Sequence, residues 1–355
     1  MPKVLGGAQV MKTARREGEG DLRRMQVQGP SSSSQQKPNS PMSRRADVPD
    51  PAPASARCSS RRTEADWDMR GLEWSTEAVV KPFSVTRWSI DRHSILKIYR
   101  GIEPHRRQLG EAEALQLATR WGIAVPKVIA TCAHVDEPWS IFSVVPGSVR
   151  PVRTDQDVER YLRHVRNLTA RLEAQAVGLT PGIGWSQRGG EIASGNRRFM
   201  VDQLADRCRT YPWWSTLHAR LSIVEADPIV YLHGDLKAEH FLVTDNEAHA
   251  VDWEACSRGP AACDSADVAF HVLRDLLYDG HVVQPMTVTL LSRLGTPGAV
   301  LAWRLIRWAD RRRAGDLALI PSRDLDELSL EMNPVTACQR LTQLIATLRA
   351  RGVPR

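Results

Sequence analysis

The sequence lacks the features that would place this protein in a membrane or in an oxidising compartment. No apolar run approaches the ~18 residues that a membrane-spanning helix needs. The N-terminus has no continuous apolar stretch of the kind found in secretory signals. The six cysteines are scattered over 355 residues without a C-x-x-C pair. We therefore expect a cytoplasmic protein with reduced thiols, and neither a disulfide framework nor a membrane partner.

A strong net charge is also absent from most of the chain. Residues 1–66 hold 12 Lys and Arg against 7 Asp and Glu, whereas the rest of the chain holds 36 against 34. The first segment is rich in Ser and Pro, a composition that buries too little apolar surface to offset the entropy of ordering. We predict a disordered basic tail over residues 1–66. The nearly balanced remainder does not indicate a nucleic-acid partner.

Two aspartates stand out in the second half of the chain. Asp235 follows one apolar run and precedes another, and Asp252 ends a third. Short apolar runs bounded by polar residues are typical of buried strands, here over residues 229–232, 241–243 and 248–251. We predict a hairpin between the aspartates, with both at one end of a small sheet. Such a pair suits phosphoryl transfer: one Asp takes the proton of a hydroxyl, and the other holds Mg²⁺ at the nucleotide phosphates.

The residues around these aspartates form a two-part motif. His233-Gly234-Asp235 followed by Asp252-Trp253-Glu254 resembles the aminoglycoside phosphotransferase and choline kinase family. The resemblance implies an α+β, bilobal, protein-kinase-like fold. A small antiparallel-sheet N-lobe with one helix would occupy residues 67–145, and a larger, mainly helical C-lobe residues 146–355. It also implies ATP and Mg²⁺ as cofactors and a hydroxyl group as the acceptor.

The resemblance assigns roles to the residues of the motif. Asp235 is the expected catalytic base, and His233 belongs to the same catalytic loop, beneath which such a histidine packs. Lys237 matches the protein-kinase lysine that steadies the γ-phosphate. Asp252 matches the ligand of the bridging metal, and Glu254 is expected to help with metal or substrate.

Nucleotide-binding candidates lie upstream. Lys97, in a strand predicted over residues 94–99, resembles the lysine that pairs with the α- and β-phosphates. Glu111, in a helix predicted over residues 106–121, matches the glutamate that fixes this lysine, and Glu113 is the alternative on another helix face. Ser84 and its neighbouring amides are candidates for covering the phosphates, although residues 81–84 contain no glycine. Backbone groups near Val145 are expected to bind adenine.

One residue departs from the family pattern. The family places Asn five residues after the catalytic Asp, where this chain has His240. Mg²⁺ prefers oxygen ligands, whereas imidazole suits softer metals. Three roles are therefore open to His240. It ligates a metal ion such as Mn²⁺, it forms a hydrogen bond with a phosphate oxygen, or it only packs against its neighbours.

Further segments complete the expected C-lobe. Residues 258–269 resemble the family segment that braces the catalytic loop, with either Asp264 or Asp267 as the matching aspartate. The aromatic cluster at 211–214 fits a core better than a substrate cleft. Apolar periodicity predicts an amphipathic helix over 155–173, a helical segment over 199–223 interrupted at those aromatics, and helices over 264–278, 286–294, 299–313 and 336–350.

The leading hypothesis is a phosphotransferase acting on a small molecule, an antibiotic or a metabolite. One alternative is a Ser/Thr kinase of a ribosomally made precursor peptide. Another is a nucleotide-binding pseudokinase, suggested by His240 and by the missing glycines. A third treats His233, Asp235 and His240 as ligands of a metal hydrolase. The sequence does not identify the acceptor.

Overall fold

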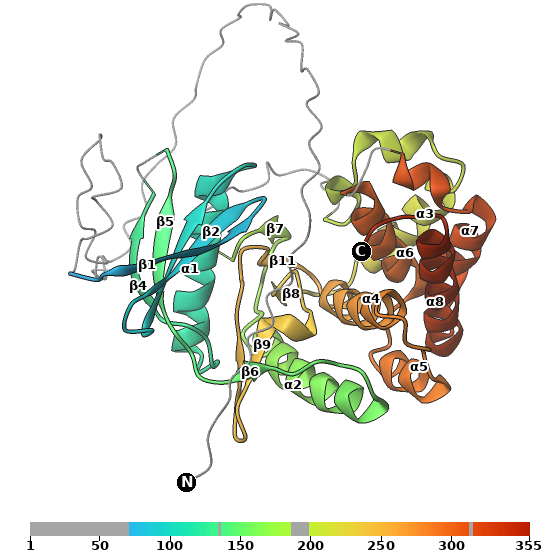
Figure 1. Ribbon diagram of the computed structural model, residues 1–355. Coiled ribbons are helices and arrows are strands. Elements are labelled where there is room, and N and C mark those ends of the chain that lie inside the picture. Colours follow the sequence, from blue (N-terminus) through green and yellow to red (C-terminus); the bar gives the residue numbers. More distant parts are fainter. Residues whose placement is uncertain (1–70, 134–135, 186–198, 312–314) are drawn as a thin grey trace, which may run out of the picture. The chain divides into compact units, whose positions relative to one another are not determined.

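The computed structural model describes residues 71–133, 136–185, 199–311 and 315–355, so the predicted basic tail lies outside the described residues. The first described part is a five-stranded antiparallel sheet in the order β1-β2-β3-β5-β4 (Figure 1). Its strands are β1 (Trp74–Lys81), β2 (Ser84–Ser89), β3 (Ser94–Tyr99), β4 (Val128–Cys132) and β5 (Trp139–Ser143).

The sheet has a hydrophobic core of its own. It consists of alternate residues from four strands, which share one face of the sheet: Val85, Leu96, Ile98, Cys132, Trp139 and Ile141. Helix α1 (Pro104–Arg120) contacts β3, β4 and β5 and begins with a proline in its first turn. Its buried residues Ala114, Leu115 and Ala118 belong instead to the large core of the following part. The helix therefore packs against the other face of the sheet, which carries Lys97 and Ser140, and joins it to the large core.

Helix α2 (Asp155–Glu173) has the predicted bounds because its N-terminus is capped by its own side chains. The Thr154 hydroxyl accepts a hydrogen bond from the Asp157 N–H at 3.2 Å, and the Asp157 carboxylate accepts one from the Thr154 N–H at 3.0 Å. This reciprocal capping box satisfies two N–H groups that the helix leaves open. The stripe containing Val158, Leu162 and Val165 is buried, as the apolar periodicity predicts.

The strands around the two aspartates form two small sheets, not one. β8 (Ile229–Leu232) pairs with β11 (Ser257–Pro260), which also pairs with β7 (Gly182–Ile183). β9 (Phe241–Val243) and β10 (Ala248–Ala250) form the predicted hairpin and add β6 (Ser148–Val149). The prediction of a common sheet was therefore wrong, because a loop and a 3₁₀ turn at Ala238–His240 break the strand direction after β8.

This topology explains how the aspartates are positioned. After β7, the chain crosses from one small sheet to the other between β8 and β9 and returns between β10 and β11. Asp235 lies on the first crossover and Asp252 on the second. The two crossovers approach closely at Gly234, where an added Cβ would lie 2.0 Å from the Ala255 carbonyl oxygen. Gly234 also has φ +82°, a conformation that favours glycine.

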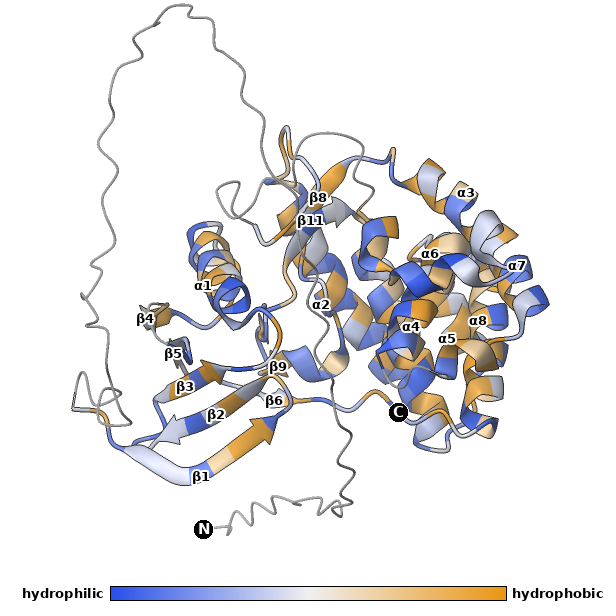
Figure 2. Cartoon of the chain, turned by 90° about the horizontal axis from the view of Figure 1, so that it is seen from above, coloured by the Kyte–Doolittle hydropathy of each residue, from blue (hydrophilic) through white to orange (hydrophobic). Residues whose placement is uncertain are grey.

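The C-terminal part is a bundle of helices, visible in both views (Figures 1 and 2). Helix α6 contacts α3, α4, α7 and α8, and almost all of its residues are buried. Four predicted helices are found with shifts of a few residues at their ends, whereas α7 was not predicted. The helices are α3 (Trp214–Val224), α4 (Ala262–Tyr278), α5 (Pro285–Ser292), α6 (Gly298–Asp310), α7 (Ser322–Leu330) and α8 (Pro334–Ala350).

The segment expected to be largely helical over residues 199–223 is less regular than predicted. It contains two short 3₁₀ turns, Val201–Gln203 and Asp206–Thr210, before α3 begins. Pro212 disfavours the helical conformation in the residue before it, which is consistent with this late start. Trp213 is fully buried and stacks with Tyr211, so it is a core residue, as expected.

The predicted α+β fold is confirmed: a small antiparallel sheet with one helix is followed by a larger, mainly helical lobe. Among the described residues, every helix is too short or too polar to cross a bilayer.

Candidate active site

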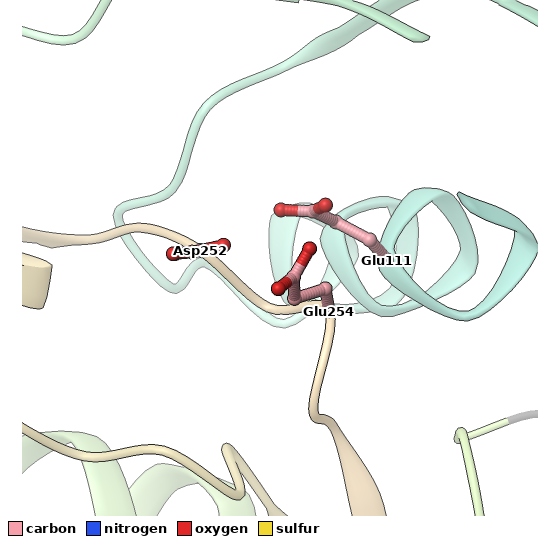
Figure 3. A group of neighbouring side chains, drawn as sticks. All are labelled: Glu111, Asp252 and Glu254. Atoms are coloured by element: carbon pink, nitrogen blue, oxygen red, sulfur yellow. The ribbon is translucent and has the colours of Figure 1, made fainter. Parts of the chain in front are cut away.

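Lys97 lies at the centre of the site, on β3. Its ammonium group is 2.8 Å from Glu111 Oε2, 2.7 Å from Asp252 Oδ1 and 3.1 Å from Glu254 Oε2. Figure 3 shows these three carboxylates converging from α1 and from the crossover after β10. Burial alone would lower the pKa of Lys97, but the carboxylates outweigh it and raise this pKa well above its usual value. Lys97 is therefore a cation at neutral pH.

Glu111 is the glutamate that holds this lysine, and both of its oxygens are used by the protein. Oε2 accepts a second hydrogen bond from the Tyr99 hydroxyl at 2.7 Å, and Oε1 accepts one from the Trp253 N–H at 3.1 Å. These bonds join the sheet, α1 and the second crossover. Because its hydrogen-bonding capacity is largely taken up in this way, Glu111 is suited to positioning Lys97 rather than to binding an ion.

Asp252 and Glu254 each keep an oxygen that does not contact Lys97. The second oxygen of Asp252 is 3.3 Å from His240 Nε2 and 3.8 Å from the Lys81 ammonium. Glu254 Oε2 binds Lys97 and, at 2.9 Å, Arg107. Burial would raise the pKa of Asp252, but Lys97 and His240 hold it well below its usual range. Both carboxylates are thus hard, negatively charged donors at one edge of the site.

Asp264, at the start of α4, braces the catalytic loop. Its two carboxylate oxygens accept hydrogen bonds from the N–H groups of His233 and Gly234, each at 2.8 Å. Burial and the nearby Asp267 raise the pKa of Asp264 to about 7. Asp267 instead forms an ion pair with Arg304. Of the two aspartates left open by the sequence, Asp264 is therefore the one that holds the loop.

His233 joins the two crossovers through contacts with other residues of the chain. It is fully buried, its ring lies 4.4 Å from that of Trp253, and Nε2 lies 3.1 Å from the Val251 carbonyl. Burial, with a contribution from His240, lowers the pKa of His233 to about 4, so the neutral ring donates to that carbonyl. The grouping of His233 with the catalytic residues is corrected to a positioning role.

The metal-hydrolase alternative is also wrong on geometry. In the part of the chain that the structure describes, the one potential metal cluster consists of Glu111, Asp252 and Glu254. His233 is engaged with a main-chain carbonyl and is not available as a ligand.

Asp235 is surrounded by cations and imidazoles. Lys237 Nζ lies 3.3 Å from Oδ2, and His271 Nε2 lies 3.3 Å from Oδ1. Burial would raise the pKa of Asp235, but His271, His240 and Lys237 outweigh it and hold this pKa well below its usual range. Asp235 is accordingly ionised and can accept a hydrogen bond from a hydroxyl group.

His271 was missed by sequence reasoning. Its Nε2 is 2.8 Å from Arg304 Nη2 as well as 3.3 Å from Asp235 Oδ1, so it can accept from the arginine or donate to the aspartate, but not both at once. A signal was present in the sequence. Asp264, Asp267 and His271 recur at intervals of three and four residues, and such positions share one face of a helix.

His240 bridges the two aspartates. Its Nδ1 lies 2.9 Å from the Asp235 carbonyl oxygen, which can only accept, so Nδ1 carries a hydrogen. In a neutral ring, Nε2 then presents a lone pair towards Asp252 Oδ2, 3.3 Å away. A proton or a metal ion between these two atoms would relieve the repulsion of their lone pairs. His240 thus faces the site rather than only packing.

Replacing His240 with Asn is expected to shift metal preference towards Mg²⁺. An amide oxygen is a harder donor than an imidazole nitrogen, which favours Mn²⁺ by comparison. The measurement is the ratio of turnover with Mn²⁺ to turnover with Mg²⁺ in the wild type and in His240→Asn. His249→Asn is the control, because His249 lies on β10 and contacts Glu247 instead. Equal ratios in all three proteins would remove His240 from the metal site.

Within the described ranges, neither the side chain of Ser84 nor Val145 forms a hydrogen bond with Lys97 or with the three carboxylates around it. Ser84 is buried at the start of β2 and pairs with Lys81, which leaves Pro82 and Phe83 as a two-residue turn. Val145 follows β5. The N–H groups of Ser143 and Val144 are bonded to main-chain carbonyls, whereas among the described residues no hydrogen bond involves the main chain of Val145. The backbone of Val145 is therefore available to a ligand.

Arg107 fixes the β1–β2 turn to the site and was not predicted. Its guanidinium donates to the Phe83 carbonyl at 2.9 Å and to Glu254 at 2.9 Å. An arginine thus fixes the turn that would cover bound phosphates. The turn lacks the glycines that would make it flexible.

The site combines a lysine on the small sheet, its glutamate partner on helix α1 and two aspartates on neighbouring crossovers of the larger lobe, the arrangement of a kinase-like phosphotransferase. Residues 83–285, more than half of the chain, match the model of the phosphotransferase enzyme family (APH). The chain belongs to this family. No curated protein sequence matches the chain.

Several solved structures are similar to this chain. Amicoumacin kinase hAmiN, in complex with AMP-PNP, Ca²⁺ and Ami, is 11% identical, with a TM-score of 0.48 over 80% of this chain and 93% of that chain. A choline/ethanolamine kinase family protein from Mesorhizobium loti is 14% identical, with a TM-score of 0.46 over 79% and 95%. Aminoglycoside phosphotransferase APH(4)-Ia, with ADP and hygromycin B, is 12% identical, with a TM-score of 0.49 over 82% and 99%.

Proposed function

We propose that this protein transfers the γ-phosphate of ATP to a hydroxyl group of a small molecule, an antibiotic or a metabolite. One observation carries the proposal. Lys97 is 2.7 Å from Asp252, and His240 links Asp252 to the segment that bears Asp235. A phosphate-binding cation, a metal-binding carboxylate and an ionised base are thereby held in one connected network.

The network supports a separate role for each residue. Asp235 would orient the acceptor hydroxyl and take its proton, since its surroundings keep it ionised. Lys97, held by Glu111, would bind the α- and β-phosphates once nucleotide displaces some of its present carboxylate contacts. Lys237, which contacts Asp235 and Glu239, would steady the transferring phosphoryl group. His233 and Asp264 would hold the loop that carries the base.

The residues at this edge of the site fit a divalent metal ion. Asp252 and Glu254 supply hard carboxylate oxygens from the cluster that also contains Glu111. His240 lies outside that cluster, but its Nε2 faces Asp252 across 3.3 Å and its other nitrogen is already bonded. We assign Asp252 and Glu254 as the Mg²⁺ ligands, with His240 as a ligand that favours Mn²⁺. Bound metal would neutralise charge on the nucleotide phosphates.

The remaining assignments follow the same scheme. Residues 67–145 would form the N-lobe and residues 146–355 the C-lobe, with residues 1–66 as a tail. Adenine would bind at Val145, whose main-chain groups are unused by the described residues. Ser84 is buried, so the N–H of Phe83, the one turn residue with an amide hydrogen, is better placed than the Ser84 side chain to meet phosphate.

The test is a transfer assay with γ-labelled ATP, Mg²⁺ or Mn²⁺, and a panel of hydroxylated small molecules. Label is expected in at least one acceptor, and nucleotide binding is expected without any acceptor. Nucleotide binding with no transfer to small molecules or to Ser- and Thr-containing peptides would favour the pseudokinase alternative. Transfer to peptides alone would favour the precursor-peptide alternative.

A further inference from the structure

A cleft of about 600 Å³ opens on the catalytic loop. Its walls come from the β1–β2 turn, the start of α1, the two crossovers and α6. Gly234, the neighbour of Asp235, and Glu254 form part of its lining, and Trp303 and Arg307 of α6 form another part. The volume suits a small molecule, and a lining that includes the residue before Asp235 suits the acceptor of the proposed phosphotransferase.

Most acidic residues that line this cleft are already neutralised. Glu103 is paired with Arg106 at 2.5 Å, and Glu254 is paired with Arg107 at 2.9 Å and with Lys97. Asp267 is paired with Arg304, on the helix that forms the cleft wall. The last acid, Asp202, is exposed. Of the four carboxylates in the lining, only that of Asp202 is therefore left to offer negative charge to an acceptor.

Two cationic side chains of the lining have no such partner. Within the ranges that the structure describes, neither Arg307 nor Arg311 forms an ion pair or a side-chain hydrogen bond. Arg307 is half-buried, and its guanidinium lies 4.6 Å above the ring of Trp303. Burial, with the charges of Arg311 and Arg304, lowers the pKa of Arg307 to about 9. A guanidinium nevertheless keeps its proton at neutral pH.

The stacking on Trp303 defines what Arg307 can bind. The ring holds the guanidinium carbon 4.6 Å from its centroid, and the N–H groups of Arg307 are used by no hydrogen bond among the described residues. Paired N–H groups of this kind match the geometry of a carboxylate or a phosphate. The nearby Asp267 attracts Arg307, but this carboxylate already forms an ion pair with Arg304. A half-buried cation without an ion pair of its own is unfavourable, and an anionic ligand would compensate for it.

We propose that the hydroxyl acceptor of this enzyme carries an oxyanion group, either a carboxylate or a phosphate. This group binds Arg307 beside Trp303, and Arg311 lies one helical turn further along the cleft. The proposal rests on the phosphotransferase function above and specifies its substrate class. A polycationic acceptor would add positive charge to this wall and would be repelled. Arg307 is accordingly a specificity-determining residue.

The experiment measures oxyanion binding without turnover. The full chain is saturated with AMP-PNP and Mg²⁺, so that the nucleotide site is filled, and calorimetry then follows the binding of glycerate, glycerol 3-phosphate and uncharged glycerol. Wild type should bind the two anions more tightly than glycerol. Arg307→Gln should weaken anion binding roughly ten- to hundredfold, the usual value of a charge-assisted hydrogen bond. Arg307→Lys should fall between, because it keeps the charge but not the paired N–H groups.

Arg293→Gln is the matched control, because Arg293 is an exposed arginine at the end of α5 and does not line the cleft. Circular dichroism melting checks that each variant is folded, and Arg311→Gln provides a second cleft variant, with a smaller expected loss. Tighter glycerate binding would identify a carboxylate, and tighter glycerol 3-phosphate binding a phosphate; either supports the proposal.

Two results would overturn the inference: anion binding that is equal in wild type and Arg307→Gln, or a preference of the wild type for glycerol over both anions. These experiments distinguish a failure of this inference from a failure of the proposed function. Arg307-dependent anion binding without any transfer of label from ATP would reject the kinase activity alone. Transfer to neutral or cationic acceptors with no effect of Arg307 would reject this inference alone.

Discussion

Asp235→Asn should reduce phosphoryl transfer by roughly a thousandfold, within the usual range for loss of a general base. Asn has nearly the same shape but cannot take a proton from the acceptor hydroxyl. Nucleotide affinity should change little, because Asp235 contacts His271 and Lys237 rather than Lys97. The measurement is turnover with labelled ATP, together with the Kd of a fluorescent ATP analogue.

The pKa of Asp235 adds a pH signature to this prediction. Because His271, His240 and Lys237 hold this pKa well below its usual range, the base stays ionised as the pH falls from 8 to about 5, above the ordinary Asp value of ~3.9. Protonation of Asp235 should therefore produce no acid limb in this window. Asp227→Asn, at an exposed position after α3, is the control and should be fully active. Unchanged turnover in Asp235→Asn would remove this residue from the base role.

Asp252→Asn should produce a loss of similar size with a different signature. An amide is a weaker ligand than a carboxylate for a hard divalent ion, so the metal concentration needed for half-maximal activity should rise and nucleotide affinity should fall. Asp235→Asn should change neither quantity. A metal titration of both variants separates the two roles, and an unaltered metal requirement in Asp252→Asn would exclude Asp252 as a ligand.

The same substitution should lower the melting temperature at pH 7. Lys97 would keep Glu111 and Glu254 but lose the negative charge that now lies 2.7 Å away, and a buried cation with fewer counter-charges is destabilising. The direction in which this destabilisation changes with pH follows from the lowered pKa of Asp252. Its stabilising contribution is present above the ordinary Asp value of ~3.9 and is lost as the pH falls through the lower value of the folded state. The difference in melting temperature between wild type and variant should therefore shrink in strong acid.

The sequence pattern predicted helices and strands correctly wherever interactions between residues close in the sequence determine the structure. Helix α2 has the predicted bounds because its apolar stripe and its Thr154–Asp157 capping box lie within the helix and its first turn. The β9–β10 hairpin was predicted because the turn residues lie between its strands. The failures have non-local causes. β8 pairs with β11, a strand more than twenty residues away, and no feature of residues 229–232 specifies that partner.

What the sequence by itself determined is the chemistry available to this protein: the His-Gly-Asp and Asp-Trp-Glu motifs, the strand lysine and the helix that carries two glutamates. The tertiary structure decided which of these groups meet. It selected Glu111 over Glu113, gave the bracing role to Asp264, and brought His271 and Arg304 beside the base. It also left Arg307 without an ion pair among the described residues, whereas Arg304 of the same helix has one. These outcomes depend on which helix faces pack against each other, and those faces are far apart in the sequence. Apolar periodicity identifies the buried face of a helix but does not specify the element against which it packs.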